Sequence, residues 1–172
     1  MLVALLLAGC GIRPPAEMSD WERENIDRRP VEDNVALPPY PRAANLVEFT
    51  VSDPGGFRFF IDAATLAVGK DAIVRYVLVA RSAEGAQNVS YEGLRCASAD
   101  HRVYALGRPD GTWAPARGDW RPLRAAGQRQ VALYREYFCP QKQPIRDAAE
   151  GVRALRAGGH PSYKAFAGER GI

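Results

Sequence analysis

The chain has 172 residues, of which 47% are hydrophobic and 25% charged, with a formal net charge of +3. This composition is that of an ordinary globular protein with room for one domain and an additional segment. The small net charge does not indicate nucleic acid as a partner, because binding to a phosphate backbone needs a larger basic excess.

The first eleven residues, "MLVALLLAGCG", predict an export signal. Residues 2–8 are all apolar, about half the length that a transmembrane helix needs, and they suit the apolar region of a signal peptide. The tetrapeptide from Leu7 to Cys10 resembles the lipobox of bacterial lipoproteins. We therefore expect residues 1–9 to be a signal peptide and Cys10 to carry the lipid that anchors the mature chain.

Two features refine this expectation. No Lys or Arg precedes Cys10, although signal peptides begin with a basic segment, so we interpret Met1 as a misassigned or internal start. By analogy with lipoprotein sorting, Gly11 favours the outer membrane, facing the periplasm. The alternative is a buried N-terminal strand or helix in which Cys10 is a small apolar side chain.

The three cysteines are Cys10, Cys96 and Cys139. If lipidation consumes Cys10, the remaining two are expected to form a disulfide in the oxidising periplasm, worth about 4 kcal/mol in the chain-entropy model. Two buried free thiols are the alternative. A zinc site is disfavoured because its ligands usually come in close pairs such as CxxC.

Residues 10–45 predict a tether between the lipid and the domain. "GIRPPAE" and "LPPYPRAAN" are rich in proline and therefore extended, and "SDWEREN" between them could form one short helix. "PPYP" could also be a ligand for a proline-binding domain. The domain itself is expected over residues 46–160, followed by a flexible tail over residues 161–172.

From residue 46 the pattern is that of β-strands. The expected strands, separated by short turn sequences such as "SDPGG" and "RPDG", are "LVEFTV", "FRFFID", "AIVRYVLVARS", "NVSYEGLRC", "HRVYALG" and "TWAP". Since no helix intervenes, they predict an antiparallel meander of five to six strands.

Helical periodicity follows in the last third of the chain. Residues 131–138 present one apolar face and end before Pro140, and a second helix is expected from about Pro144 to Gly158. The second helix should bury Ile145, Ala148, Ala149, Val152 and Leu155, and turn Arg146, Glu150 and Arg153 to water. Strands followed by helices predict an α+β fold with both amphipathic helices packed on one face of the sheet.

Several blocks of the sequence resemble, in order, those of the CNP-one-like family, which are small exported lipoproteins of proteobacteria. They are "FRFFIDAATLAVG", "VRYVLVARSAEGAQNVSYEGLRC", "DGTW", "LYREYFCP" and "EGVRALRAGGHP", and the resemblance covers about residues 36–161. It implies an envelope protein of unknown function, with Cys96 and Cys139 in matching positions. It implies no catalytic residues.

The residues offer little sign of an enzyme. His101 and His160 have no carboxylate or nucleophile at a spacing that forces proximity, and no GxSxG, HExxH or phosphate-binding loop is present. Asp62 and Glu92 both fall in the sheet region, as a pair of carboxylates does in most such domains. We expect no enzyme, cofactor or metal; the alternative is a hydrolase or transferase acting on cell-envelope polymers.

A binding role has more support. Residues 117–156 hold nine Lys or Arg and four acidic residues, interleaved with aromatic side chains. Arg146, Arg153 and Arg156 are the candidate contact residues, and an anionic envelope component or a protein is the expected partner beside the membrane. A solvated helix face with i,i+4 ion pairs such as Arg146 with Glu150 would explain the same pattern.

Overall fold

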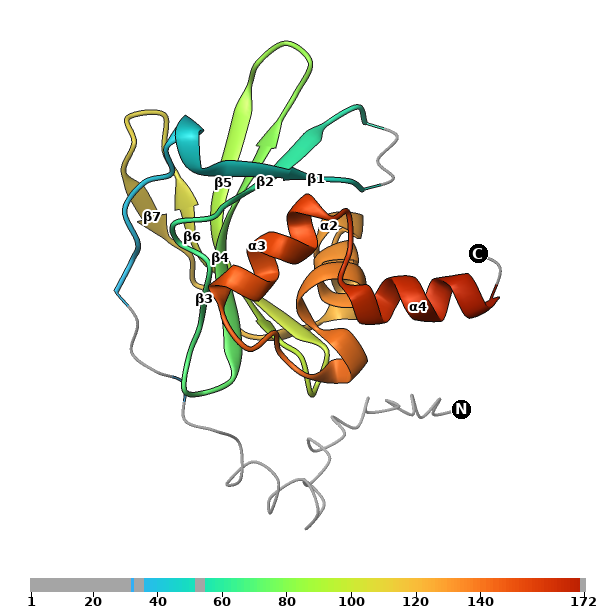
Figure 1. The fold of residues 1–172 in the computed structure, drawn as a ribbon. Coiled ribbons are helices and arrows are strands. Elements are labelled where there is room, and N and C mark those ends of the chain that lie inside the picture. Colours follow the sequence, from blue (N-terminus) through green and yellow to red (C-terminus); the bar gives the residue numbers. More distant parts are fainter. Residues whose placement is uncertain (1–31, 33–35, 52–54, 171–172) are drawn as a thin grey trace, which may run out of the picture. The chain divides into compact units, whose positions relative to one another are not determined.

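The computed structural model describes residues 32, 36–51 and 55–170 (Figure 1). The expected signal peptide, Cys10 and most of the expected tether lie outside these residues. The described chain forms an antiparallel sheet with helices from its C-terminal third packed against it, which confirms the α+β class. None of the described helices combines the length and the apolar character that a membrane span requires.

The sheet has eight strands, not the expected five to six. The strands are β1 Leu46–Phe49, β2 Arg58–Asp62, β3 Ala67–Val68, β4 Ile73–Arg81, β5 Gln87–Arg95, β6 Asp100–Gly107, β7 Trp113–Pro115 and β8 Arg121–Pro122. The main path runs β1-β2-β4-β5-β6-β7 in chain order, and every pairing is antiparallel.

The two additional strands, β3 and β8, contain two residues each. β3 pairs with the part of β4 that β2 leaves uncovered, and β8 pairs in the same way with the start of β6. Two residues are too few to show an alternating pattern. Their pairing depends on the long strands beside them, which is why the sequence did not predict them.

The main core lies between the sheet and the helices. β4 contributes Val74, Tyr76, Leu78 and Ala80 to this side, since alternate residues of a strand point to the same face. From the helical side, buried residues include Leu133, Tyr137, Phe138, Ile145 and Leu155. The expectation of helical segments packed on one face of the sheet is therefore confirmed for these five residues.

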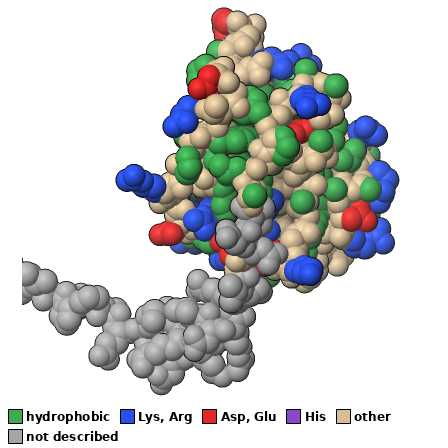
Figure 2. Space-filling model, turned by 90° about the vertical axis from the view of Figure 1, so that its left-hand side faces the viewer, with side chains coloured by type: hydrophobic (Ala, Val, Ile, Leu, Met, Phe, Trp, Pro, Cys, Tyr) green, Lys and Arg blue, Asp and Glu red, His purple; other side chains and the backbone are tan. Residues whose placement is uncertain are grey.

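The opposite face of the sheet is covered by β7 and by the segment that precedes β1. A smaller core there includes Val77, Val79, Val89 and Tyr91, with Tyr40 and Trp113 packed against it. Trp113 Nε1 donates to the carbonyl oxygen of Pro38 at 2.8 Å, and the Tyr40 hydroxyl donates to that of Arg108 at 3.0 Å. The last part of the expected tether thus packs on the domain. Figure 2 shows the β7 side of the molecule, with hydrophobic side chains near its centre and Lys and Arg around the margin.

The helical elements are short and mostly follow the sheet. They are η1 Ala43–Asn45, η2 Leu123–Ala125, α2 Gln128–Ala132, the π-helical η3 Leu133–Phe138, η4 Pro140–Lys142, α3 Ala148–Arg156 and α4 Pro161–Arg170. α2 and η3 are continuous and form the first expected helix. The segment expected to be a flexible tail contains α4.

The second expected helix, α3, begins at Ala148 rather than near Pro144. The Asp147 side chain caps it by accepting from the Glu150 backbone N–H at 2.7 Å. Because Ile145 precedes the helix, the expected apolar face is shifted, and Ala149 is exposed. Glu150 is also not turned to water: its side chain is 16% exposed and folds back to accept from the backbone N–H of Arg146.

A disulfide joins Cys96, just after β5, to Cys139, just after η3. It links the end of a strand to the end of the first helix, and it is the bond that the sequence predicts between the two remaining cysteines. Both cysteines are buried in the main core.

Candidate functional site

The candidate site is built around Glu92, a carboxylate that is 1% exposed in the middle of β5. Glu92 lies opposite Tyr76 of β4 in the strand register, so both side chains point to the helix-covered face. On its other side the β5–β6 register shifts between Tyr91 and Glu92, because β6 contains one more residue there, Tyr104. Such bulges are common where a sheet must re-aim a side chain near a site.

Three uncharged donors hold the Glu92 carboxylate. The Ser90 hydroxyl donates to Oε1 at 2.6 Å, and the Tyr76 hydroxyl donates to Oε2 at 3.2 Å. Gln130, from α2, donates through Nε2 to Oε1 and Oε2 at 3.3 and 3.1 Å. A buried charge is expensive unless hydrogen bonds compensate for its lost hydration, and these donors provide that compensation.

The surroundings of Tyr76 keep its phenol protonated, so that it can donate a hydrogen bond. Burial raises the pKa of the Tyr76 phenol well above its usual value, and the negative charge and hydrogen bond of Glu92 raise it further. Gln130 is only partly satisfied: its Oε1 is buried and has no hydrogen-bond partner among the described residues. The cluster therefore combines a firmly held carboxylate with one unused acceptor.

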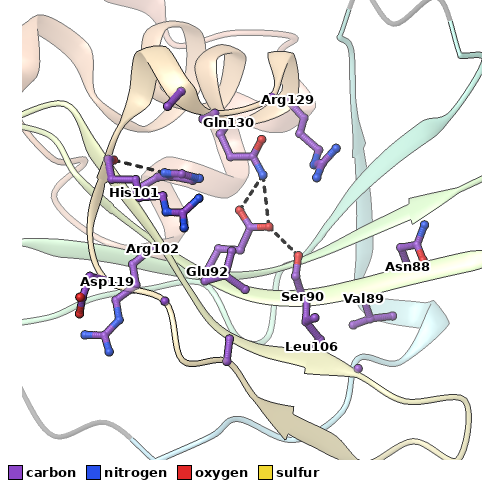
Figure 3. A pocket seen from close by; sticks show the side chains of 18 residues that line it. Asn88, Val89, Ser90, Glu92, His101, Arg102, Leu106, Asp119, Arg129 and Gln130 are labelled. Carbon is purple, nitrogen blue, oxygen red and sulfur yellow. Dashed lines mark hydrogen bonds between the residues drawn. The ribbon is translucent and has the colours of Figure 1, made fainter. Parts of the chain in front are cut away.

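A pocket of about 560 Å³ opens over this cluster (Figure 3). Ser90, Glu92 and Gln130 are among the residues that line it, together with His101, Arg121 and Arg129. In Figure 3 Gln130 points from its helix toward Glu92, and Ser90 approaches the same carboxylate from the strand. The pocket thus combines a buried acidic group with basic side chains.

A second, smaller pocket of about 260 Å³ adjoins the first and shares Asn88, Ser90 and Arg129 with it. Its other lining residues are mainly apolar and include Phe57, which is 36% exposed. Arg129 Nε is buried without a hydrogen-bond partner in the described part of the chain. Together the two pockets form a groove, to which the second pocket adds the side chains of Phe57, Phe59, Leu78 and Ala80.

Of the histidines and carboxylates that the sequence analysis considers, some lie in this site and others do not. His101 lines the pocket, where its Nδ1 lies 3.3 Å from the carbonyl oxygen of Arg121. Asp62 does not line it; its side chain instead accepts from the backbone N–H of Ala64 at 3.3 Å. His160 lies near α3, with Nε2 3.3 Å from Oε1 of Glu150.

The predicted contact residues Arg146, Arg153 and Arg156 are not brought to the Glu92 pocket. Arg146 precedes α3 and pairs with Glu150 through Nε at 3.2 Å, as its i,i+4 spacing suggested. The hydrogen bond from the backbone N–H of Arg146, with smaller contributions from the side chains of Arg146 and His160, outweighs the effect of burial and lowers the pKa of Glu150 to about 2. Arg153 and Arg156 lie in the last turn of α3 and are exposed.

Sequence reasoning passed over the residues that form the site. Glu92 was considered only as one of two carboxylates in the sheet region, and Gln130 was not singled out. The one available signal was a charged residue inside a strand whose neighbours are buried, as in "YEGL". Such a residue needs partners from elsewhere in the fold.

Among the described residues, no group of three or more His, Cys, Asp or Glu side chains is placed to hold a metal ion. The fold and the pocket define an α+β domain with a groove between its sheet and its first helix that is lined by both charged and apolar residues.

Comparison with models of protein families identifies the chain further. The CNP1-like family matches residues 26–156, which is more than half of the 172 residues. The chain belongs to this family. No curated protein and no solved structure matches the chain.

Proposed function

We propose that the protein is a lipoprotein of the outer membrane, anchored through Cys10 and facing the periplasm, whose domain binds or scaffolds a component of the cell envelope without catalysis. The Glu92 pocket is the proposed binding site. The observation that carries this proposal is the composition of the pocket: a buried carboxylate on one wall and arginines around it.

The way Glu92 is held supports binding rather than proton transfer. Its two oxygens accept from a serine, a tyrosine and an amide, all supplied by the domain itself. Because the pKa of Tyr76 is raised, that hydroxyl does not give up its proton near neutral pH. These bonds hold the carboxyl group in one position, which is the role of an orienting group in a binding pocket.

The pocket's chemistry indicates the class of ligand. Arg121 and Arg129 favour an anionic group, and Gln130 Oε1 is an unused acceptor for a hydroxyl or amide donor. Phe57, Phe59 and Leu78 in the adjoining pocket suit a non-polar part of the same molecule. An anionic, hydroxyl-bearing polymer of the envelope has these groups.

Co-sedimentation of the full chain carrying Cys10→Ser, with purified peptidoglycan and with vesicles containing lipopolysaccharide, tests the binding site. We expect binding to one of them at low salt, and at least a fivefold loss when Arg121 and Arg129 are both changed to Gln. Arg124→Gln is the matched control, because Arg124 is an exposed neighbour that does not line the pocket. Equal binding by all three proteins would contradict the proposed site.

The anchor has its own test, which does not depend on the pocket. Replacing Cys10 with Ser should abolish labelling by a fatty-acid analogue in cells, provided that expression begins at the true start. Persistent labelling would show that Cys10 is not the lipidated residue.

The alternative, a hydrolase or transferase acting on envelope polymers, is favoured by one observation: His101 and Asp119 line the same pocket as Glu92. Incubation with peptidoglycan should then release soluble fragments, and Glu92→Gln and His101→Ala should each stop the release. Binding without any release would support the binding module.

A further inference from the structure

A second polar cluster lies on the face of the sheet opposite Glu92. Arg75 of β4 and Arg102 of β6 both pair with Gly93 of β5, so the two arginines flank a position without a side chain. Arg95, two residues along β5, shares this face. The bulge residue Tyr104 occupies the space above Gly93, where an added Cβ would lie 2.8 Å from its hydroxyl oxygen.

The carboxylate of Glu32 sits among these side chains. The Tyr104 hydroxyl donates to Oε1 at 2.5 Å, while Arg102 NH1 and Trp120 Nε1 each donate to Oε2 at 3.0 Å. We call the five side chains around Glu32 the cradle: they are Arg75, Arg95, Arg102, Tyr104 and Trp120. Glu32 belongs to the segment, residues 10–45, that the sequence predicts to be a tether.

The cradle is preformed by contacts other than those to Glu32. Arg75, whose side chain is 3% exposed, is held by Asp71 through a pair of hydrogen bonds, one of them 3.0 Å long. The Arg95 guanidinium lies 4.0 Å from the centre of the Trp120 ring, and that of Arg102 lies 5.3 Å from the centre of the Tyr104 ring. These stacking contacts orient the two cations that are partly open to solvent.

Glu32 does not use the full capacity of the cradle. Arg75 NH2 and Arg95 NH2 lie 3.7 and 3.9 Å from its oxygens, which is too far for hydrogen bonds. The Nε atoms of Arg75 and Arg102 are buried and have no hydrogen-bond partner in the described part of the chain. Among the described residues, the three arginines form ion pairs with two carboxylates, those of Glu32 and Asp71, so one positive charge exceeds the negative charges that these residues supply.

We propose that the cradle is a binding site for a phosphate group, that Glu32 occupies it as an internal ligand, and that a phosphate supplied from outside replaces Glu32. A phosphate monoester carries up to two negative charges and three acceptor oxygens, against one charge and two oxygens for a carboxylate. It therefore matches both the remaining charge and the unused donors. The planar guanidinium group of an arginine can also donate two parallel hydrogen bonds to two oxygens of a tetrahedral phosphate.

The site is accessible once Glu32 leaves. The side chains of Arg95 and Arg102 are 22% and 29% exposed, and that of Glu32 is 20% exposed. Displacement of Glu32 would free Arg102, Tyr104 and Trp120 to donate to the incoming group. Of the five cradle residues, Arg102 also lines the Glu92 pocket, whereas Arg75, Arg95, Tyr104 and Trp120 do not. The contacts to Glu32 lie on the other face of the sheet, and the proposal does not rest on the proposed function.

Titration of the full chain with inorganic phosphate, followed by calorimetry, tests the proposal. Glu32→Gln removes the competing charge and should bind phosphate roughly tenfold more tightly than the wild type, because like charges repel. Glu48→Gln is the matched control, since Glu48 pairs with the exposed Arg58 far along the sheet edge. Adding Arg102→Gln to the Glu32→Gln protein should abolish the gain.

Different results of this titration support or overturn the proposed phosphate site. Saturable phosphate binding that is stronger in Glu32→Gln than in Glu48→Gln supports the site, and equal or absent binding in both overturns it. Acetate at the same ionic strength is the comparison ligand; if acetate binds Glu32→Gln as tightly as phosphate does, the preference for phosphate is wrong. If Glu32→Gln does not fold, shown by circular dichroism, Glu32→Ser serves as the second variant.

A further arm identifies the source of the phosphate. The full chain with Cys10→Ser and Glu32→Gln is mixed with phosphatidylcholine vesicles that contain either phosphatidic acid or phosphatidylglycerol. Stronger binding to phosphatidic acid, a monoester, indicates a lipid headgroup as the ligand. Binding of inorganic phosphate without this preference indicates a soluble phosphate compound.

Discussion

Glu92 and Glu32 interact with opposite faces of the same sheet, and the fold stabilises the two carboxylates differently. Glu92 accepts hydrogen bonds from uncharged groups of its own strands and of α2. Glu32 is met by a cation, a phenol and an indole from β6 and the segment before β8. The uncharged arrangement depends on packing, whereas the charged one depends on ion pairs. The two sites should therefore respond differently to substitution, pH and salt.

The largest effect is expected at the buried ion pair of the cradle face. Arg75→Met removes the guanidinium group that pairs with the carboxylate of Asp71, whose side chain is 1% exposed. Removing one partner of a buried pair costs about 3–5 kcal/mol of unfolding free energy. Urea denaturation measures it, with Arg58→Met in the exposed pair as control. A loss below about 1 kcal/mol would mean that Asp71 is not dependent on Arg75.

On the helix-covered face, the disulfide should have the next largest effect. Replacing Cys96 and Cys139 together with Ala should lower the free energy of unfolding by about 2–5 kcal/mol, because the bond restricts the unfolded chain. Urea denaturation again provides the measurement. Intact mass after alkylation under denaturing, non-reducing conditions should leave both cysteines unmodified in the wild type, and two added alkyl groups would contradict the bond.

Gln130→Leu tests how strongly the uncharged donors matter. The substitution removes the only amide that donates to Glu92 within the described chain, and a buried group that loses its partner costs about 1–3 kcal/mol. Gln128→Leu, exposed on the same helix, is the control. If both variants unfold at the same urea concentration, Glu92 does not need the amide.

The contribution of Glu32 to stability should also depend on pH. Burial by itself would raise the pKa of Glu32, but the hydrogen bonds from Tyr104 and Trp120 and the charges of Arg102 and Arg75 together hold it below its ordinary value of 4.5. Glu32 therefore stabilises the fold above pH 4.5, and this contribution is lost as the pH falls through the lowered pKa.

The measurement is the thermal midpoint as a function of pH for the wild type and Glu32→Gln. The wild type should be the more stable protein at neutral pH, and the difference should shrink as the pH falls below 4.5. A difference that is the same at every pH would assign the effect to packing rather than to the charge of Glu32.

The smallest effect on stability is expected at the exposed arginines that the sequence proposed as a contact. Changing Arg146, Arg153 and Arg156 to Gln should leave the unfolding midpoint unchanged within error, because exposed ion pairs contribute little. If these residues contact an anionic partner, the triple variant should co-sediment less with it, and added salt should weaken wild-type binding too. Unchanged binding would leave the Glu92 pocket as the remaining contact site.

Much of the fold could be predicted because its signals are local. The long strand β4 is a nearly continuous run of apolar residues, β5 is rich in residues typical of strands, and Pro140 ends the first helix where the apolar face stops. The start of α3 was misplaced because Pro144 suggested an earlier beginning, while the cap at Asp147 decided it. β3 and β8 could not be predicted, since strands of two residues exist only through their pairing.

The sequence by itself determined the α+β class, the succession of long strands and the two cysteines available for a disulfide, because periodicity and residue chemistry are properties of neighbouring residues. Only the tertiary structure decided which polar residues meet. Gln130 reaches Glu92 across 38 positions of the chain, and Glu32 reaches Tyr104 across 72. Such meetings depend on strand register, on the bulge at Tyr104 and on helix packing, and these arise from the sum of contacts over the whole domain.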